Sequence, residues 1–109
     1  MKKVLATCVA MIVAGAWVVQ ADTKANWDKH CAKCHGEDGK AQTKMGQKLK
    51  IRDYTDPKVQ AELKDDAMLK AIKDGYEQGG KKTMNGFDKK ITEQEMKDLV
   101  TFIRKLKKS

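Results

Sequence analysis

Aromatic residues and proline are scarce in this chain of 109 residues. Only 6% of the residues are aromatic and proline occurs once, whereas 35% of the residues are charged. A chain of this length has room for one domain, and so few large apolar side chains make a poor hydrophobic core for it. The composition alone therefore does not account for a stable fold.

Histidine and cysteine are scarce too, with two and three residues. So few histidines leave no Ser, Cys or Asp nucleophile paired with a base, which argues against an enzyme that uses such a nucleophile. The basic pI near 9.4 does not indicate nucleic-acid binding, because the lysines lack interleaved aromatic residues. Composition thus excludes two common functions without yet indicating another.

Long hydrophobic runs are absent except at the N-terminus. There an apolar run of 16 residues follows two lysines, and Val19-Gln20-Ala21 fits a cleavage site. A membrane-spanning helix needs about 20 residues, so an uncleaved anchor is the weaker alternative. Residues 1–21 are predicted to be a secretory signal peptide, and residues 22–109 the mature domain, in the periplasm or otherwise outside the cytoplasm.

One short motif dominates the predicted mature domain. Cys31-Ala32-Lys33-Cys34-His35 is C-x-x-C-H, the attachment signature of a c-type haem. Two thiols at this spacing can lie on one side of a helical turn and add to both vinyl groups of one porphyrin. His35 follows at once and can ligate the iron as the proximal ligand. The motif predicts one covalently bound haem c.

A zinc site built from the same residues is the alternative to a haem. It fails on ligand count, and the direct adjacency of Cys34 and His35 is unsuited to zinc. A buried porphyrin would also supply the large apolar surface that the composition lacks. Folding is therefore expected to depend strongly on haem attachment.

The residues on both sides of the motif resemble the small class I cytochromes c. The run Trp27–Gly39 is similar to their haem-binding start, and Met84-Asn85-Gly86-Phe87 with the helix after it is similar to their distal-methionine loop and closing helix. The resemblance implies the all-α cytochrome c fold, with about four helices and long loops wrapped around one haem. It also implies that Met84 is the second iron ligand, although the family usually has proline where this chain has Asn85.

Local patterns indicate where the first helices lie. A first helix is expected over residues 25–33, which lack glycine and proline, with Trp27 in the core. Asp56-Pro57 combines an N-cap with proline at the first helical position and predicts a short helix. A further helix, capped by Asp65 or Asp66, is predicted to stop at Gly75 and to bury Met68.

The last helix is the clearest of these elements. Thr92-x-x-Glu95 forms a capping box, and one apolar stripe follows at helical spacing. The stripe consists of Met96, Leu99, Val100, Ile103 and Leu106. Residues 40–55 are expected to be a long loop with a short turn inside, and residues 78–83 another loop. No strands are predicted.

Two residues of the first loop, Arg52 and Tyr54, are candidates for contact with a haem propionate. Their guanidinium and phenol groups can donate hydrogen bonds to a carboxylate. A solvated arginine and a half-buried tyrosine explain the same residues equally well. The sequence leaves this choice open.

A histidine–methionine pair on the iron would leave no position for a substrate, so the chain is expected to be a monomeric electron carrier and not an enzyme. The predicted mature domain lacks Lys2 and Lys3 of the signal peptide. It has 21 basic and 15 acidic residues, a formal charge of +6. Redox partners with acidic docking faces are therefore expected, with solubility as the alternative role of the lysines. No stable membrane insertion is expected.

The alternative function is a five-coordinate haem. Such a protein would sense a small ligand or reduce peroxide at the open iron position. It requires that Met84 does not bind the iron, so the second axial ligand decides between the two functions.

Overall fold

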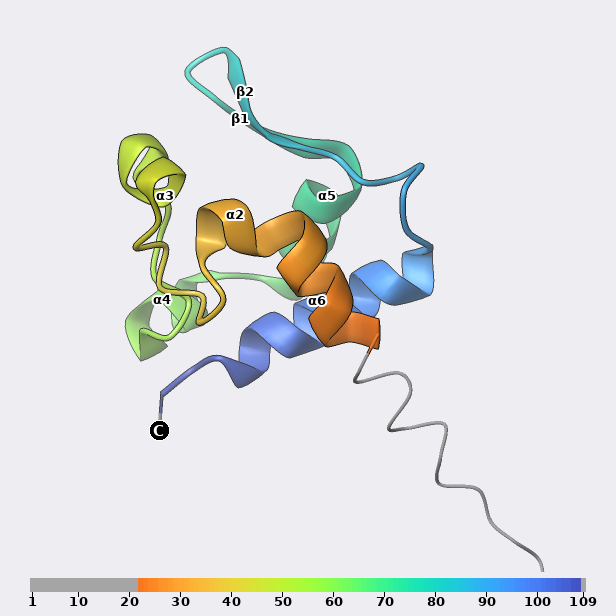
Figure 1. The fold of residues 1–109 in the computed structure, drawn as a ribbon, viewed down its shortest axis with the longest axis horizontal. Helices are drawn as coiled ribbons and strands as arrows, with labels where there is room; N and C mark the ends of the chain where they lie inside the picture. Colours follow the sequence, from red (N-terminus) through yellow and green to blue (C-terminus); the bar gives the residue numbers. More distant parts are fainter. Residues whose placement is uncertain (1–21, 109) are drawn as a thin grey trace, which may run out of the picture.

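The computed structural model describes residues 22–108 of the chain. Helices form most of it, with one small antiparallel sheet at the edge (Figure 1). The predicted signal peptide over residues 1–21 lies outside the described residues. Within residues 22–108, no helix is long and apolar enough to cross a membrane.

The first helical segment is continuous from residue 22 to His35. After residues 22–26, Trp27–Cys31 form the π-helical turn η1, and Ala32–His35 form the short helix α2. The predicted helix over residues 25–33 is confirmed and extends further at both ends. Wide π-turns often occur at functional sites, and this one ends on the first cysteine of the motif.

The loop predicted over residues 40–55 contains a short helix, α3, over Lys44–Leu49. The hydroxyl oxygen of Thr43 accepts a hydrogen bond from the Gly46 amide and caps this helix. Lys50 ends the helix in the left-handed conformation. The short turn expected here is thus a helix of six residues, too brief to show an apolar period in the sequence.

Two more helices lead to the edge of the core. Helix α4 covers Pro57–Glu62, and the side chain of Asp56 caps it as predicted. Helix α5 covers Asp65–Asp74, but its N-cap is Lys64, which makes no side-chain cap. The predicted cap at one of the next two aspartates is therefore wrong. Both carboxylates lie in the first turn, where they stabilise the positive end of the helix dipole.

Residues 75–85 form a β-hairpin, and the prediction that the chain has no strands is wrong here. Strand β1 (Gly75–Gln78) pairs antiparallel with β2 (Lys81–Asn85). Gly79 and Gly80 connect them with φ angles of 61° and 82°, the conformation of a type I′ turn. The strands are largely exposed and lack an alternating apolar pattern, so the Gly-Gly pair was the only signal in the sequence.

Helix α6, over Glu93–Lys105, closes the structure. Both hydrogen bonds of the predicted capping box are present. The helix crosses the first helical segment, where the rings of Trp27 and Phe102 lie 5.2 Å apart (Figure 1). The core consists of Trp27, Cys31, Met68, Ile72, Ile91, Met96, Leu99, Val100 and Ile103. The predicted stripe of α6 is confirmed as its centre, with Leu106 half-buried at its edge.

Candidate haem site

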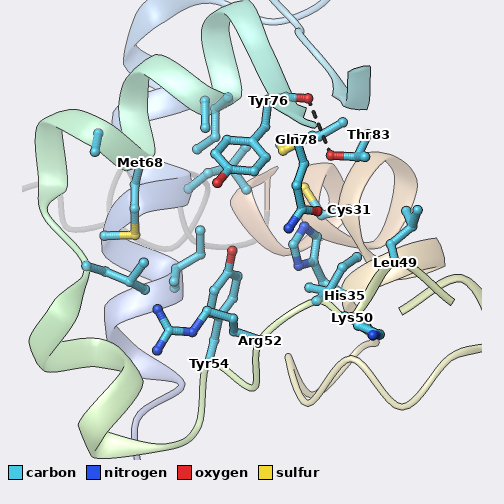
Figure 2. Close-up of a pocket in the computed structure, with 18 of the residues that line it drawn as sticks. Cys31, His35, Leu49, Lys50, Arg52, Tyr54, Met68, Tyr76, Gln78 and Thr83 are labelled. Atoms are coloured by element: carbon cyan, nitrogen blue, oxygen red, sulfur yellow. Dashed lines mark hydrogen bonds between the residues drawn. The ribbon is translucent and has the colours of Figure 1, made fainter. Parts of the chain in front are cut away.

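A cavity of about 320 Å³ opens into the core beside the C-x-x-C-H motif. Side chains of the first helical segment, α5, α6 and the hairpin form its walls, and most of them are apolar (Figure 2). The volume is within the range of small-molecule and cofactor pockets. The motif therefore lies beside a cavity that is large enough to hold a cofactor.

The two cysteines of the motif lie at different depths. Cys31 lines the cavity and is only 6% exposed, whereas Cys34 is half-buried. Both thiols are free. Burial, with a smaller contribution from the charge of Cys34, raises the pKa of the Cys31 thiol to about 12. The first thiol is therefore a neutral group inside an apolar wall.

The imidazole of His35 also lines this cavity. Its ring stacks on Tyr54, with centroids 5.1 Å apart and an angle of 20° between the planes. Burial lowers the pKa of His35 to about 4, so the ring is neutral at pH 7. Its Nδ1 atom is buried and has no hydrogen-bond partner among residues 22–108. A neutral, buried imidazole is the form that ligates a metal.

Three hydrogen bonds fix the backbone around His35. The Ala41 amide donates to the His35 carbonyl at 2.8 Å, and the Thr43 hydroxyl donates to the Cys34 carbonyl at 2.6 Å. From the other side, the Trp27 indole donates to the Gly36 carbonyl at 3.0 Å. The sequence did not predict the role of Thr43. Its position before the α3 helix was the only available signal, because capping residues are often threonine.

Two methionine side chains reach the cavity from the remaining walls. Met84 extends from β2 and is half-buried, and Met68 extends from α5 and is 7% exposed. The predicted core position of Met68 is confirmed, but its side chain faces the same cavity as His35 (Figure 2). Met96 is 1% exposed and belongs to the core, as predicted.

These residues fit a haem. Two thiols at the required spacing precede a neutral imidazole, two methionines line the same cavity as Cys31 and His35, and the walls are mostly apolar. No group of three or more His, Cys, Asp or Glu side chains that could hold a bare metal ion occurs within residues 22–108. The donor set therefore suits an iron porphyrin and not an ion bound by side chains alone.

Comparison with known proteins identifies the family of this chain. The family model described as cytochrome c matches residues 20–107. The chain belongs to the cytochrome c family. Similar solved structures include the KustC0563 c-type cytochrome and a point mutant of Kustc0563. Each is 32% identical to this cytochrome over 79% of its chain, with a TM-score of 0.67, and the match covers 98% and 99% of their chains. No curated protein matches it.

Several properties are general among members of this family. Members of the cytochrome c family bind haem c covalently, and one haem is typical of so small a domain. They are generally electron carriers that interact with redox partners, and c-type cytochromes are typically extracytoplasmic. The predicted helical fold is likewise confirmed in outline, with the hairpin as an addition.

Polar side chains also line the cavity of this cytochrome. Arg52 and Tyr54, the two propionate candidates, both line it. The Arg52 guanidinium pairs with Glu62 at an exposed position, and burial raises the pKa of Tyr54. Three further polar residues come from the hairpin, which the sequence did not predict. They are Tyr76, Gln78 and Thr83 (Figure 2).

Proposed function

We propose that this cytochrome is an exported carrier of single electrons, with haem attached through Cys31 and Cys34 and ligated by His35 and Met84. One observation carries the proposal: Met84 lines the same mostly apolar cavity as Cys31 and His35, although it lies far from that motif along the chain. Bound haem c supplies a one-electron ferric–ferrous couple. Residues 1–21 are its proposed signal peptide, which the intact mass of the exported protein would test.

Each residue has a defined task in this proposal. His35 offers a neutral imidazole nitrogen, and the hydrogen bonds around it hold the backbone of the motif in place. Met84 offers a soft, neutral thioether, which favours the reduced state and raises the potential of a His-ligated haem. The apolar walls add to this effect, because burial disfavours the extra positive charge of the oxidised state.

Partner docking is proposed to use a basic segment beside the cavity. Residues 40–52 contain five basic side chains and no acidic one. They are Lys40, Lys44, Lys48, Lys50 and Arg52. Two of them, Lys50 and Arg52, line the cavity itself. A redox partner with an acidic face would be steered to this side of the cavity.

A second candidate function, a five-coordinate haem that binds a small ligand, has one observation in its favour. The hairpin brings the phenol of Tyr76, the amide of Gln78 and the hydroxyl of Thr83 to the same cavity as Met84. Polar donors beside an open iron position stabilise bound dioxygen or peroxide. The state of the sixth iron position separates the two functions.

Visible spectra of the purified holoprotein test the proposal. Acidified solvent extraction should leave the haem on the polypeptide, and the ferric protein should show a sulfur-to-iron charge-transfer band. The ferrous protein should not change its spectrum when carbon monoxide is added, because a thioether occupies the iron. Haem in the solvent layer would contradict covalent attachment. Rapid binding of carbon monoxide would favour the five-coordinate function.

A further inference from the structure

The two ends of the hairpin meet in a close contact between glycine backbones. A Cβ atom on Gly75 would lie 2.5 Å from the Met84 oxygen and 2.9 Å from the Gly86 nitrogen. A Cβ atom on Gly86 would lie 2.4 Å from the Lys73 oxygen and 2.6 Å from the Asp74 carbonyl carbon. Real Cβ atoms essentially never approach other atoms within 3.0 Å. No side chain fits at either position unless the backbone moves.

The other end of the hairpin is unlike this base. Gly79 and Gly80 form the turn, and a Cβ atom on either would meet nothing within 4 Å. These two glycines serve the positive φ angles of the turn. Gly86 has no such angle, so a methyl group there would act only through its steric contact. Gly75 has a φ of 91°, so it combines a close contact with a special backbone conformation. Gly86 depends on close approach alone, and the tip depends on backbone conformation.

Met84 is tied to the base by the register of the strands. Gly75 pairs with Asn85, and the next pair is Tyr76 with Met84. Beyond β2, the Phe87 amide donates a hydrogen bond of 2.8 Å to the Ile72 carbonyl of α5. The glycine contact thus fixes β2 against the end of α5 one strand pair away from Met84. A shift at the base would move the Met84 side chain directly.

We propose that Gly75 and Gly86 are positioning residues that hold the Met84 sulfur at the iron. This inference rests on the proposed ligation by Met84 and adds how the ligand is kept in place. The hairpin has few other attachments, because most of its side chains are exposed. Besides the base, an exposed bond of 3.3 Å from the Lys82 ammonium to the Asp74 carbonyl joins β2 to α5. The close contact at the base is therefore the main constraint on the distance between Met84 and the opposite wall of the cavity.

The test compares Gly86→Ala with Gly79→Ala in the holoprotein. Gly86→Ala should weaken the sulfur-to-iron band of the ferric protein. It should also raise, about tenfold, the fraction of ferrous protein whose sixth iron position is free to bind carbon monoxide. Gly79→Ala strains the positive φ of the turn at the tip but its methyl group meets no other atom, so it should leave both readouts unchanged. In a Met84→Ala background, Gly86→Ala should not change carbon monoxide binding further, because the two act through the same bond.

A stability control separates positioning from general weakening of the fold. Val100→Ala truncates a buried side chain of α6 outside the cavity lining. It should lower the denaturant midpoint and leave the band intact. If Gly86→Ala keeps the full band and excludes carbon monoxide as well as wild type, the inference is wrong. If wild type already lacks the band, the proposed Met84 ligation fails first, which is a different result.

Wild-type protein gives a second test that needs no variant. The Phe87 amide bonded to Ile72 reports whether the hairpin base is closed. Under rising denaturant, its protection from hydrogen exchange and the sulfur-to-iron band should be lost together. Loss of the band while this amide stays protected would show that the base does not hold Met84, and would overturn the inference.

Discussion

The two sides of the cavity are built in different ways. On the His35 side, the proposed ligand ends a helix and lies against two aromatic rings. Its own carbonyl accepts a hydrogen bond from Ala41, and the Cys34 carbonyl accepts one from Thr43. On the other side, Met84 sits on a hairpin whose strands are mostly exposed. Many separate contacts hold the His35 side, whereas the Met84 side depends mainly on the contact at the base of the hairpin. The proposed ligand on the hairpin side is therefore the easier one to release.

The largest effect expected from this difference is that of Met84→Ala. Loss of the thioether should remove the sulfur-to-iron band, lower the potential and open the iron to carbon monoxide. Fold loss should be modest, because the contacts around His35 do not involve this side chain. Spectra and redox titration of the variant measure these changes.

Met68→Leu is the matched control, since Met68 lines the same cavity. This substitution nearly conserves volume and should cost less than about 1.5 kcal/mol without removing the band. The reverse outcome, with the band lost in Met68→Leu and kept in Met84→Ala, would assign the ligand to α5. The second ligand would then come from a helix, and the contrast between the His35 side and the hairpin would no longer describe the two iron ligands.

A smaller effect is expected from Thr43→Val on the His35 side. The change removes the hydrogen bond to the Cys34 carbonyl and the cap of α3. Together these should cost roughly 1–2 kcal/mol of unfolding free energy, measured by urea denaturation of the holoprotein. The sulfur-to-iron band should persist, because the remaining contacts keep His35 in place.

Thr101→Val serves as the control for Thr43→Val. Its hydroxyl makes one exposed bond of 3.4 Å to the Lys97 carbonyl of the same helix, so its loss should have little effect on stability. Equal destabilisation by both variants would mean that Thr43 supports the motif no more than an ordinary surface threonine.

The smallest effect concerns the basic segment beside the cavity. Lys44→Gln with Lys48→Gln should slow oxidation of the ferrous protein by ferricyanide at low salt, because two steering charges are lost. The difference should fade between ~0.01 M and ~0.15 M salt, as the Debye length shrinks from ~30 Å to ~8 Å. Lys105→Gln with Lys107→Gln changes the net charge equally at the end of the chain. If both pairs slow the reaction alike, only net charge matters.

The sequence was most informative where residue types act at fixed spacing. The C-x-x-C-H motif, the Asp56 cap and the Thr92 capping box each depend on contacts within a few residues, so they could be predicted. The proposed ligand at Met84 came from resemblance, and its place in the same cavity as His35 agrees with that prediction.

Contacts between distant segments could not be predicted in this way. The hairpin has an exposed, polar surface, and its base closes against α5 through backbone atoms of residues more than ten positions apart. This chain has Asn85 where the family usually has proline, and the next residue, Gly86, makes one of the closest backbone approaches in the described structure. The presence of Met68 in the cavity likewise follows from how α5 packs and not from its spacing.

The burial of Cys31 also sets the order in which the protein must be assembled. The residue is 6% exposed, and its thiol is a poor nucleophile, because the thiolate is the reactive form and burial opposes it. A catalyst that joins this sulfur to a porphyrin vinyl group could not reach it in the closed fold. With Cys31 as the proposed attachment site, haem would be attached while the chain around the motif is still open, and the core would close afterwards around the porphyrin.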